Sequence, residues 1–109
     1  MNQKDLVLVP FPFSNQKEGK IRPAIIISNN RYNNKNPDRI AVAVTSVIKT
    51  EPYSLFFTQD DLEGGHLLRP SRIRVDKIFT IEKSLIQHKV GTITDQKLTE
   101  IKNVFHALF

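Results

Sequence analysis

Cysteine and tryptophan are absent from this 109-residue chain, and no long hydrophobic run interrupts it. Without cysteine, the chain can form neither a disulfide nor a thiolate metal site, which fits a reducing compartment. No apolar stretch reaches the ~20 residues that a membrane-spanning helix needs, and the N-terminus lacks the apolar segment of a cleaved signal peptide. We therefore expect a cytoplasmic protein that has no membrane partner.

Basic residues outnumber acidic residues by 16 to 11, and the excess lies in the first half of the chain. Residues 1–50 carry eight basic and three acidic side chains, whereas residues 51–109 carry eight of each. A localised positive field attracts polyanions such as nucleic acids. Charge alone leaves open the simpler interpretation of a basic, well-solvated surface.

The pattern of apolar residues predicts one mainly β domain over residues 1–109, with a single C-terminal helix. Strands are expected in the ranges 5–13, 24–28, 40–48, 55–58 and 71–81, followed by a last strand that ends near residue 93. Loops are expected at 29–38 and at 60–70, the second with at most one helical turn before Gly64 and Gly65. About five to seven short strands with one helix are typical of a strongly bent sheet or a small barrel.

Prolines and one threonine refine this picture. Pro10 and Pro12 must end the pairing of the first strand or place that strand at an edge of the sheet. Pro23 belongs at the start of the second strand, because it has no N–H to donate. Thr94 has the features of a helix N-cap. The apolar stripe of the helix that follows consists of Leu98, Ile101, Phe105 and Leu108.

Four segments stand out when they are taken in order along the chain. They are residues 5–14 (DLVLVPFPFS), 21–28 (IRPAIIIS), 44–46 (VTS) and 68–78 (LRPSRIRVDKI), with a weaker fifth at 90–93 (VGTI). This ordered set resembles the MazF/PemK family of toxins. The resemblance implies an SH3-like small barrel related to CcdB, a homodimer, and sequence-selective cleavage of single-stranded RNA without a metal or another cofactor. It also implies a cognate antitoxin whose disordered tail occupies the RNA groove.

The resemblance assigns the active site to Arg22 and Thr45. In such a reaction the ribose 2′-OH attacks the adjacent phosphorus, while the enzyme moves protons and stabilises charge on the phosphorane oxygens. A guanidinium matches phosphate with a planar fork, and a hydroxyl can donate to a non-bridging oxygen. Because a guanidinium stays protonated at neutral pH, charge stabilisation or general acid catalysis suits Arg22 better than general base catalysis. Without the resemblance, a surface salt bridge for Arg22 and a strand-end hydrogen bond for Thr45 remain open.

Alternation along the strand expected at 40–48 supports Thr45 over its neighbour. Thr45 shares a face with Ala41 and Ala43, whose small side chains could leave room for a ligand. Ser46 falls on the opposite face, with the apolar side chains of a core. We therefore predict that Thr45 faces the reacting phosphate, and we keep Ser46 as a lower-ranked RNA contact.

Further side chains are candidate RNA contacts: Lys17, Glu18, Lys20, Ser46, Arg72 and Arg74. Lys17 and Lys20 cluster with Arg22 and would hold phosphate, whereas Glu18 only approximates the acidic residue that many family members carry in this loop. Arg72 and Arg74 could extend the same surface, or Asp76 could simply pair with them.

The aromatic and histidine side chains allow more than one interpretation. Phe11 and Phe13 could stack on bases, pack in the core or form a dimer contact. His66 is a second candidate for acid–base chemistry. No histidine pair shows a metal-ligand spacing, and the acidic group at 60–63 lacks the spacing of a calcium loop, so no metal is expected. The seven phenylalanines exceed what one small core hides comfortably, which favours a homodimer.

Two other classes of function fit the same barrel shape. One is a CcdB-like protein that poisons DNA gyrase, and the other is a non-catalytic barrel that binds nucleic acid or protein. Neither function needs an arginine and a threonine placed as Arg22 and Thr45 are. That pair therefore favours the ribonuclease.

Overall fold

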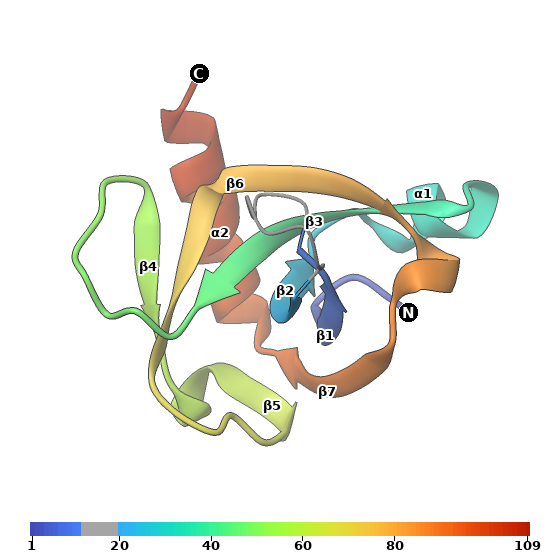
Figure 1. Cartoon of the computed structure of the whole chain (residues 1–109). Helices are drawn as coiled ribbons and strands as arrows, with labels where there is room; N and C mark the ends of the chain where they lie inside the picture. The colour runs from blue at the N-terminus through green and yellow to red at the C-terminus, as the bar shows by residue number, and fades with distance from the viewer. Residues whose placement is uncertain (12–19) are drawn as a thin grey trace.

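The computed structural model describes residues 1–11 and 20–109. They form one antiparallel seven-stranded sheet in the order β4-β6-β3-β2-β1-β7-β5, which curls into a half-barrel (Figure 1). The strands are β1 (Asp5–Pro10), β2 (Ile21–Ile26), β3 (Asp38–Thr45), β4 (Ser54–Phe57), β5 (Leu62–Gly65), β6 (Ser71–Glu82) and β7 (His88–Ile93). The helices are α1 (Asn30–Lys35) and α2 (Asp95–Ala107), with 3₁₀ turns η1 (Gln59–Asp61) and η2 (Lys83–Leu85). The mainly β fold with a C-terminal helix is confirmed.

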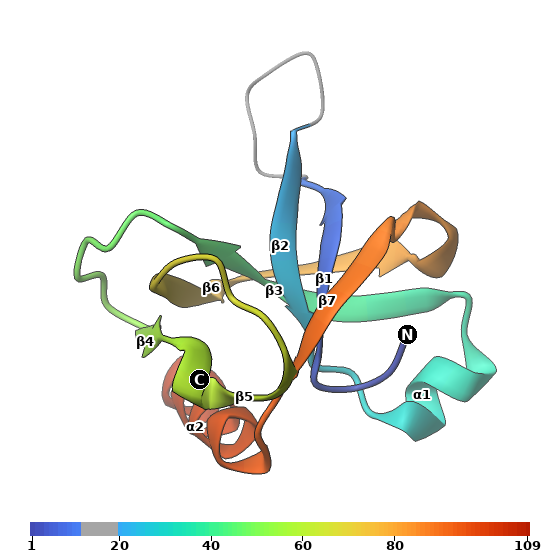
Figure 2. The same cartoon turned by 90° about the horizontal axis from the view of Figure 1, so that it is seen from below.

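Helix α2 forms as its sequence predicts. The Thr94 side chain accepts a hydrogen bond from the Lys97 amide at 3.1 Å, which caps the first turn. Leu98 and Ile101 are buried, and the last two members of the apolar stripe pack beside them. The helix packs against β4 and β6, on one side of the curled sheet (Figure 2). No helix in the described part of the chain is both long enough and apolar enough to span a bilayer.

Two cores occupy the two faces of the sheet. The helix-covered core, which lies under α2, consists of Leu6, Ile25, Val42, Val44, Phe57, Ile73, Val75, Ile93, Leu98 and Ile101. The second core, on the opposite face, consists of Val7, Val9, Ala24, Ile26, Ala41, Ala43, Phe79 and Ile81. Strand β3 separates them, with its valines in the first core and its alanines in the second. The alternation predicted for this strand is therefore confirmed.

Pro10 and Pro23 lie where strand ladders end or begin, and neither marks an edge strand of the sheet. Strand β1 lies inside the sheet between β2 and β7, and Pro10 is its last residue, opposite Ile21. Strand β2 begins earlier than expected, because its ladder with β1 starts at Ile21. Its ladder with β3 starts only at Ala24, after Pro23, which has no N–H for that side. Pro12 lies outside the described residues.

Three expectations about the loops were wrong. Residues 30–35 form α1 rather than a turn, because Asn29 caps this segment by accepting from the Tyr32 amide at 2.8 Å. Residues 62–65 form strand β5 on β7, where a glycine break was expected. Strand β3 was expected to continue to residue 48 but stops at Thr45. Its last pair with β6 is Thr45 opposite Arg72, near the start of β6.

A bulge in β6 shapes the region at the end of β3. In the β3–β6 ladder, Val42 lies opposite Ile78, whereas the next residue, Ala43, lies opposite Arg74. Residues 75–77 are therefore extra on β6, and such an insertion bends a strand and increases its twist. The bend lets the first half of β6 pair with both β4 and the end of β3.

Candidate active site

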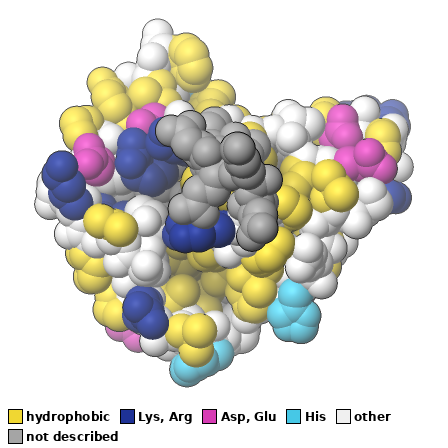
Figure 3. All heavy atoms as spheres, viewed as in Figure 1, with side chains coloured by type: hydrophobic (Ala, Val, Ile, Leu, Met, Phe, Trp, Pro, Cys, Tyr) yellow, Lys and Arg dark blue, Asp and Glu magenta, His cyan; other side chains and the backbone are white. Residues whose placement is uncertain are grey.

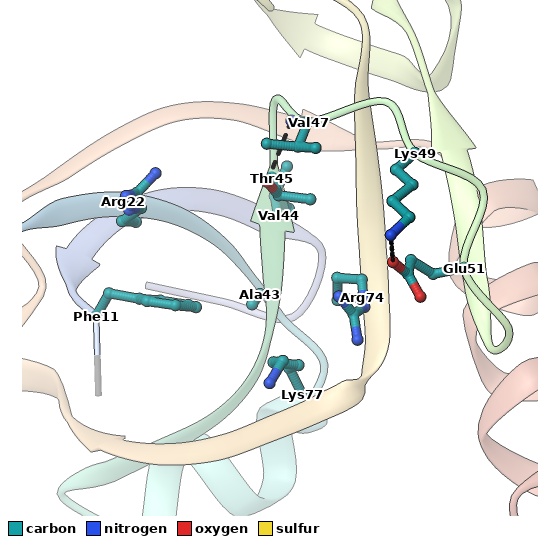
Figure 4. A pocket seen from close by; sticks show the side chains of 10 residues that line it. All are labelled: Phe11, Arg22, Ala43, Val44, Thr45, Val47, Lys49, Glu51, Arg74 and Lys77. Carbon is teal, nitrogen blue, oxygen red and sulfur yellow. Dashed lines mark hydrogen bonds and ion pairs between the residues drawn. The ribbon is translucent and has the colours of Figure 1, made fainter. Parts of the chain in front are cut away.

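Arg22 and Thr45 reach one pocket from adjacent strands. Ala24 and Ala43 form the last pair of the β2–β3 ladder, and each predicted catalytic residue lies two positions beyond it. Side chains two apart on a strand share a face, so both project on the face of the two alanines. They line a pocket of about 350 Å³ together with Ala43 (Figure 4). The structure thus brings the predicted pair together, while their chemical roles stay predictions.

The Thr45 hydroxyl is oriented by its own loop. Its Oγ1 accepts a hydrogen bond from the Val47 amide at 3.2 Å. Accepting this bond uses one lone pair and leaves the O–H as a donor. Among the described residues, none accepts a hydrogen bond from this O–H, so it can donate to an anion in the pocket.

Arg22 forms no ion pair with any other described residue. The surface salt bridge considered for this arginine therefore has no partner among the described residues, and Glu18 lies outside them. Its side chain is half-buried at the second position of β2. A guanidinium without a carboxylate partner keeps its charge available for a phosphate.

The two arginines of β6 have different surroundings. Arg74 lines the same pocket and donates from Nε and Nη2 to the two carboxylate oxygens of Asp76, at 3.0 and 2.9 Å. These bonds hold the pKa of Asp76 below its usual value and raise the pKa of Arg74. Arg72 instead donates from Nε and Nη2 to the Ser54 hydroxyl, at 3.1 and 3.0 Å, on strand β4. Pairing by Asp76, one of the two interpretations, holds for Arg74 alone.

Lys77 and Lys49 are pocket residues that the sequence did not single out. Strict alternation would place residue 77 with Ile73 and Val75 in the core, but the bulge at 75–77 breaks the alternation. Lys49 projects from the loop after β3, with its Nζ 3.8 Å from a carboxylate oxygen of Glu51. Nothing in the sequence pattern indicates that this loop folds back over the pocket. Each of these lysines adds positive charge.

The pocket as a whole is basic. Among the described residues, four cationic side chains line it, against one carboxylate from Glu51: they are Arg22, Lys49, Arg74 and Lys77. In the surface view, several lysine and arginine side chains lie on the face that is shown (Figure 3). Such a cluster around a hollow favours a polyanionic ligand.

Phe11 contacts both the pocket and the second core. It lines the pocket, and its ring meets Phe79 edge-on with centroids 6.4 Å apart. Core packing therefore accounts for part of its role. Phe13, like Lys17 and Glu18, lies outside the described residues.

The comparison with known proteins decides the family. A family model described as PemK-like, MazF-like toxin of type II toxin–antitoxin system matches residues 2–109. The chain belongs to this family. An endoribonuclease MazF of Staphylococcus saprophyticus is 28% identical over 106 residues, which cover 94% of this chain and 86% of that protein.

Solved toxins of this family share the fold. A MazF of Deinococcus radiodurans superimposes with a TM-score of 0.78 at 22% identity, covering 99% of this chain and 94% of that one. A mycobacterial endoribonuclease in complex with its cognate antitoxin also reaches 0.78, at 19% identity, covering 98% and 92%. The resemblance to the MazF/PemK family is confirmed.

The remaining predicted residues that the structure describes lie outside this pocket of the toxin. Ser46 and His66 line a neighbouring pocket of about 240 Å³, which also includes Arg22. Ser46 is exposed, so its assignment to the core was wrong, because β3 ends one residue before it. Lys20 is exposed beside Arg22 and lines neither pocket.

Acidic residues of the toxin serve the fold. Asp61 accepts from the Thr58 amide at 2.9 Å and so caps η1, and Glu63 pairs with Lys4 at 3.1 Å. Over residues 1–11 and 20–109, the structure holds no group of three or more His, Asp or Glu side chains that could hold a metal ion.

Proposed function

We propose that this toxin, an endoribonuclease of the MazF type, cuts single-stranded RNA at the pocket of Arg22 and Thr45, without a metal or another cofactor. The observation that carries this proposal is the meeting, in one basic pocket, of an oriented hydroxyl and a guanidinium that has no ion-pair partner among the described residues. The ribose 2′-oxygen loses its proton and forms a bond to phosphorus as the bond to the 5′-oxygen breaks, and the 5′-oxygen takes up a proton. The products carry a 2′,3′-cyclic phosphate and a 5′-OH.

Each side chain has a role that fits its surroundings. Arg22 stabilises the phosphorane charge or protonates the departing 5′-oxygen, and Thr45 donates to a non-bridging oxygen. Arg74, held in one orientation by Asp76, supplies a second planar fork for a phosphate. Further RNA contacts are proposed at Lys17, Glu18, Lys20, Ser46 and Arg72, of which Lys17 and Glu18 lie outside the described residues.

An antitoxin and a second copy of the chain are the proposed protein partners. The mycobacterial relative was solved with its cognate antitoxin, and a MazE–MazF complex is known from Deinococcus radiodurans. The basic pocket suits an acidic antitoxin segment. For the homodimer, Phe56 and Phe109 are 48% and 92% exposed and offer apolar surface. A sedimentation experiment that finds only monomer at micromolar concentration would contradict the dimer.

We further propose that residues 1–109 work as a single toxin domain in the cytoplasm. The family model spans residues 2–109 without a break. Expression of this chain alone should arrest growth, and co-expression of the antitoxin should relieve the arrest.

Single-turnover cleavage, measured beside RNA binding, tests the mechanism. Arg22→Ala should lower the cleavage rate by about 10²–10⁴-fold while RNA still binds. Lys20→Ala is the matched control, because it removes one neighbouring positive charge that lines neither pocket. It should weaken binding modestly and reduce the salt dependence by about one counterion. Arg22→Lys should not restore the full rate, because an ammonium lacks the planar fork.

Several outcomes would contradict the proposal. Loss of activity in EDTA with recovery in magnesium would rule out a metal-free reaction, and products with a 5′-phosphate would rule out 2′-OH attack. Normal cleavage by Arg22→Ala at saturating RNA would make Arg22 a phosphate anchor, with His66 the next candidate to test. If the protein inhibits gyrase supercoiling and cuts no RNA, the CcdB-like alternative holds.

A further inference from the structure

Arg22 stands between two pockets. One is the pocket of about 350 Å³ that it shares with Thr45, and the other is the pocket of about 240 Å³ that it shares with Ser46 and His66. A phosphate bound by Arg22 has a nucleoside on each side. The second pocket therefore lies within reach of one of these two nucleosides.

The second pocket has the size and lining that a single nucleobase needs. Its walls are mainly apolar, and they include the buried side chains of Leu6 and Val44 and the ring of Pro23. The polar residues of the lining include Ser46, His66 and Arg69. Its volume is below the roughly 300–1,000 Å³ of sites for drug-sized ligands. Unstacked bases of single-stranded RNA are bound in this way, by apolar or planar contact with the ring and hydrogen bonds to its edge.

One wall of the second pocket is formed by residues 66–69, which link β5 to β6. Within this segment Leu67 turns inward and packs against the helix-covered core, whereas Leu68 is 87% exposed. The His66 amide donates to the Val90 carbonyl of β7 at 3.2 Å. The position of the wall therefore depends on how this short segment is held to the body of the protein.

Gln59 holds that segment through both atoms of its side-chain amide. Its Oε1 accepts from the Leu67 amide at 2.7 Å, and its Nε2 donates to the Gly65 carbonyl at 3.2 Å. The side chain thus pairs with residues 65 and 67 as a neighbouring strand would. Gln59 itself starts η1, whose ends are fixed by the reciprocal bonds of Thr58 and Asp61.

We propose that the second pocket binds the base of a nucleotide next to the scissile phosphate, and that Gln59 is the positioning residue that sets this base subsite. The proposal rests on the proposed function, because it takes Arg22 as the contact of the scissile phosphate. Arg22 lines both pockets, so an RNA strand whose phosphate binds Arg22 can also place a base in the second pocket. This favours RNA over a peptide as the occupant. Gln59 acts at a distance, through the wall at residues 66–69, and touches no reacting atom.

The test uses a short RNA with one mapped cleavage site and two derivatives, in which the nucleotide on either side of the cut is abasic. Loss of a stacked base should lower kcat/KM of the wild-type protein by about 5–150-fold for one derivative and much less for the other. Gln59→Ala should lower kcat/KM for the intact RNA, and removal of the same base should then have little further effect. Gln96→Ala, on the exposed face of α2, is the matched control and should behave as wild type. Thermal unfolding checks that Gln59→Ala remains folded.

Two results would overturn the proposal. If the wild-type protein cuts both abasic RNAs as well as the intact one, no base is bound beside the phosphate. If Gln59→Ala and base removal act additively, Gln59 does not set the subsite. In both cases the wild type still yields cyclic phosphate ends and still depends on Arg22, which separates this failure from a failure of the proposed function. Weaker inhibition of Gln59→Ala by an antitoxin peptide, with no dependence on the base, would assign the pocket to a peptide instead.

Discussion

The two faces of strand β3 are built from different kinds of side chain. Val42 and Val44 fill the helix-covered core and are 0% and 2% exposed. Ala43 and Thr45 point the other way, where α2 does not reach, and line the candidate active site. Large branched side chains fill the space under the helix, whereas small ones leave a hollow on the uncovered face. The same strand therefore stabilises the fold with one face and forms the site with the other.

The largest effect is expected where neighbouring residues of β4 fall on the two faces. Phe57 is fully buried in the helix-covered core, whereas Phe56 is 48% exposed. Phe57→Ala should lower the free energy of unfolding by about 3–5 kcal/mol, because it leaves a cavity. Phe56→Ala should change the unfolding free energy of the monomer, measured at a protein concentration below that of the proposed dimer, by less than about 0.5 kcal/mol. Urea unfolding of both variants checks this, and equal losses would show that the two faces are not distinct.

The next effect concerns activity on the uncovered face. Thr45→Val keeps the branched shape but removes the hydroxyl, so the single-turnover cleavage rate should fall by about 10–100-fold, less than for Arg22→Ala. Stability should change by only about 1 kcal/mol, since one hydrogen bond to the Val47 amide is lost. Thr45→Ser, which restores the hydroxyl, should recover most of the rate. If Thr45→Val cleaved RNA at the wild-type rate, the Thr45 hydroxyl would have no part in the mechanism.

Adjacent glycines of β5 give a sharper comparison. Gly65 has φ +88°, and a Cβ there would lie 2.2 Å from the Val90 carbonyl oxygen, whereas a Cβ on Gly64 would meet nothing within 4 Å. Gly65→Ala should therefore cost more than about 1 kcal/mol of unfolding free energy and disturb the wall at residues 66–69. Gly64→Ala should be tolerated. Urea unfolding measures the loss in each variant. If Gly65→Ala were as stable as the wild type, β5 would be able to move away from β7.

The smallest effect is expected from the ion pair on the uncovered face. Because Arg74 lowers the pKa of folded Asp76, this carboxylate stabilises the fold above its unfolded pKa of about 3.9. That contribution is lost as the pH falls through the folded pKa. The stability difference between wild type and Asp76→Asn should be about 0.2–1 kcal/mol at neutral pH and should vanish in acid. Urea unfolding across the pH range measures it, and a difference that persists in acid would contradict the assignment.

Some features followed from the sequence because they depend on near neighbours. The alternation of β3 assigned Thr45 to the face of the alanines, and Thr94 capped the helix whose stripe lies in the core. Pro10 ends the β1–β2 ladder and Pro23 precedes the β2–β3 ladder, since proline has no N–H to donate. The ordered motifs pointed to the MazF/PemK family, which the comparison with known proteins confirms.

Other features were decided only by contacts between distant parts of the chain. Strand β5 exists because β7 comes close enough to pair with its glycines, and Lys77 reaches the pocket because the bulge in β6 ends its alternation. Arg72 and Arg74 look alike in sequence, yet one binds Ser54 on β4 and the other lines the site. Local pattern specifies which way a side chain points along a regular strand. Where the strands bend, end and meet depends on tertiary packing, and there the two pockets around Arg22 are formed.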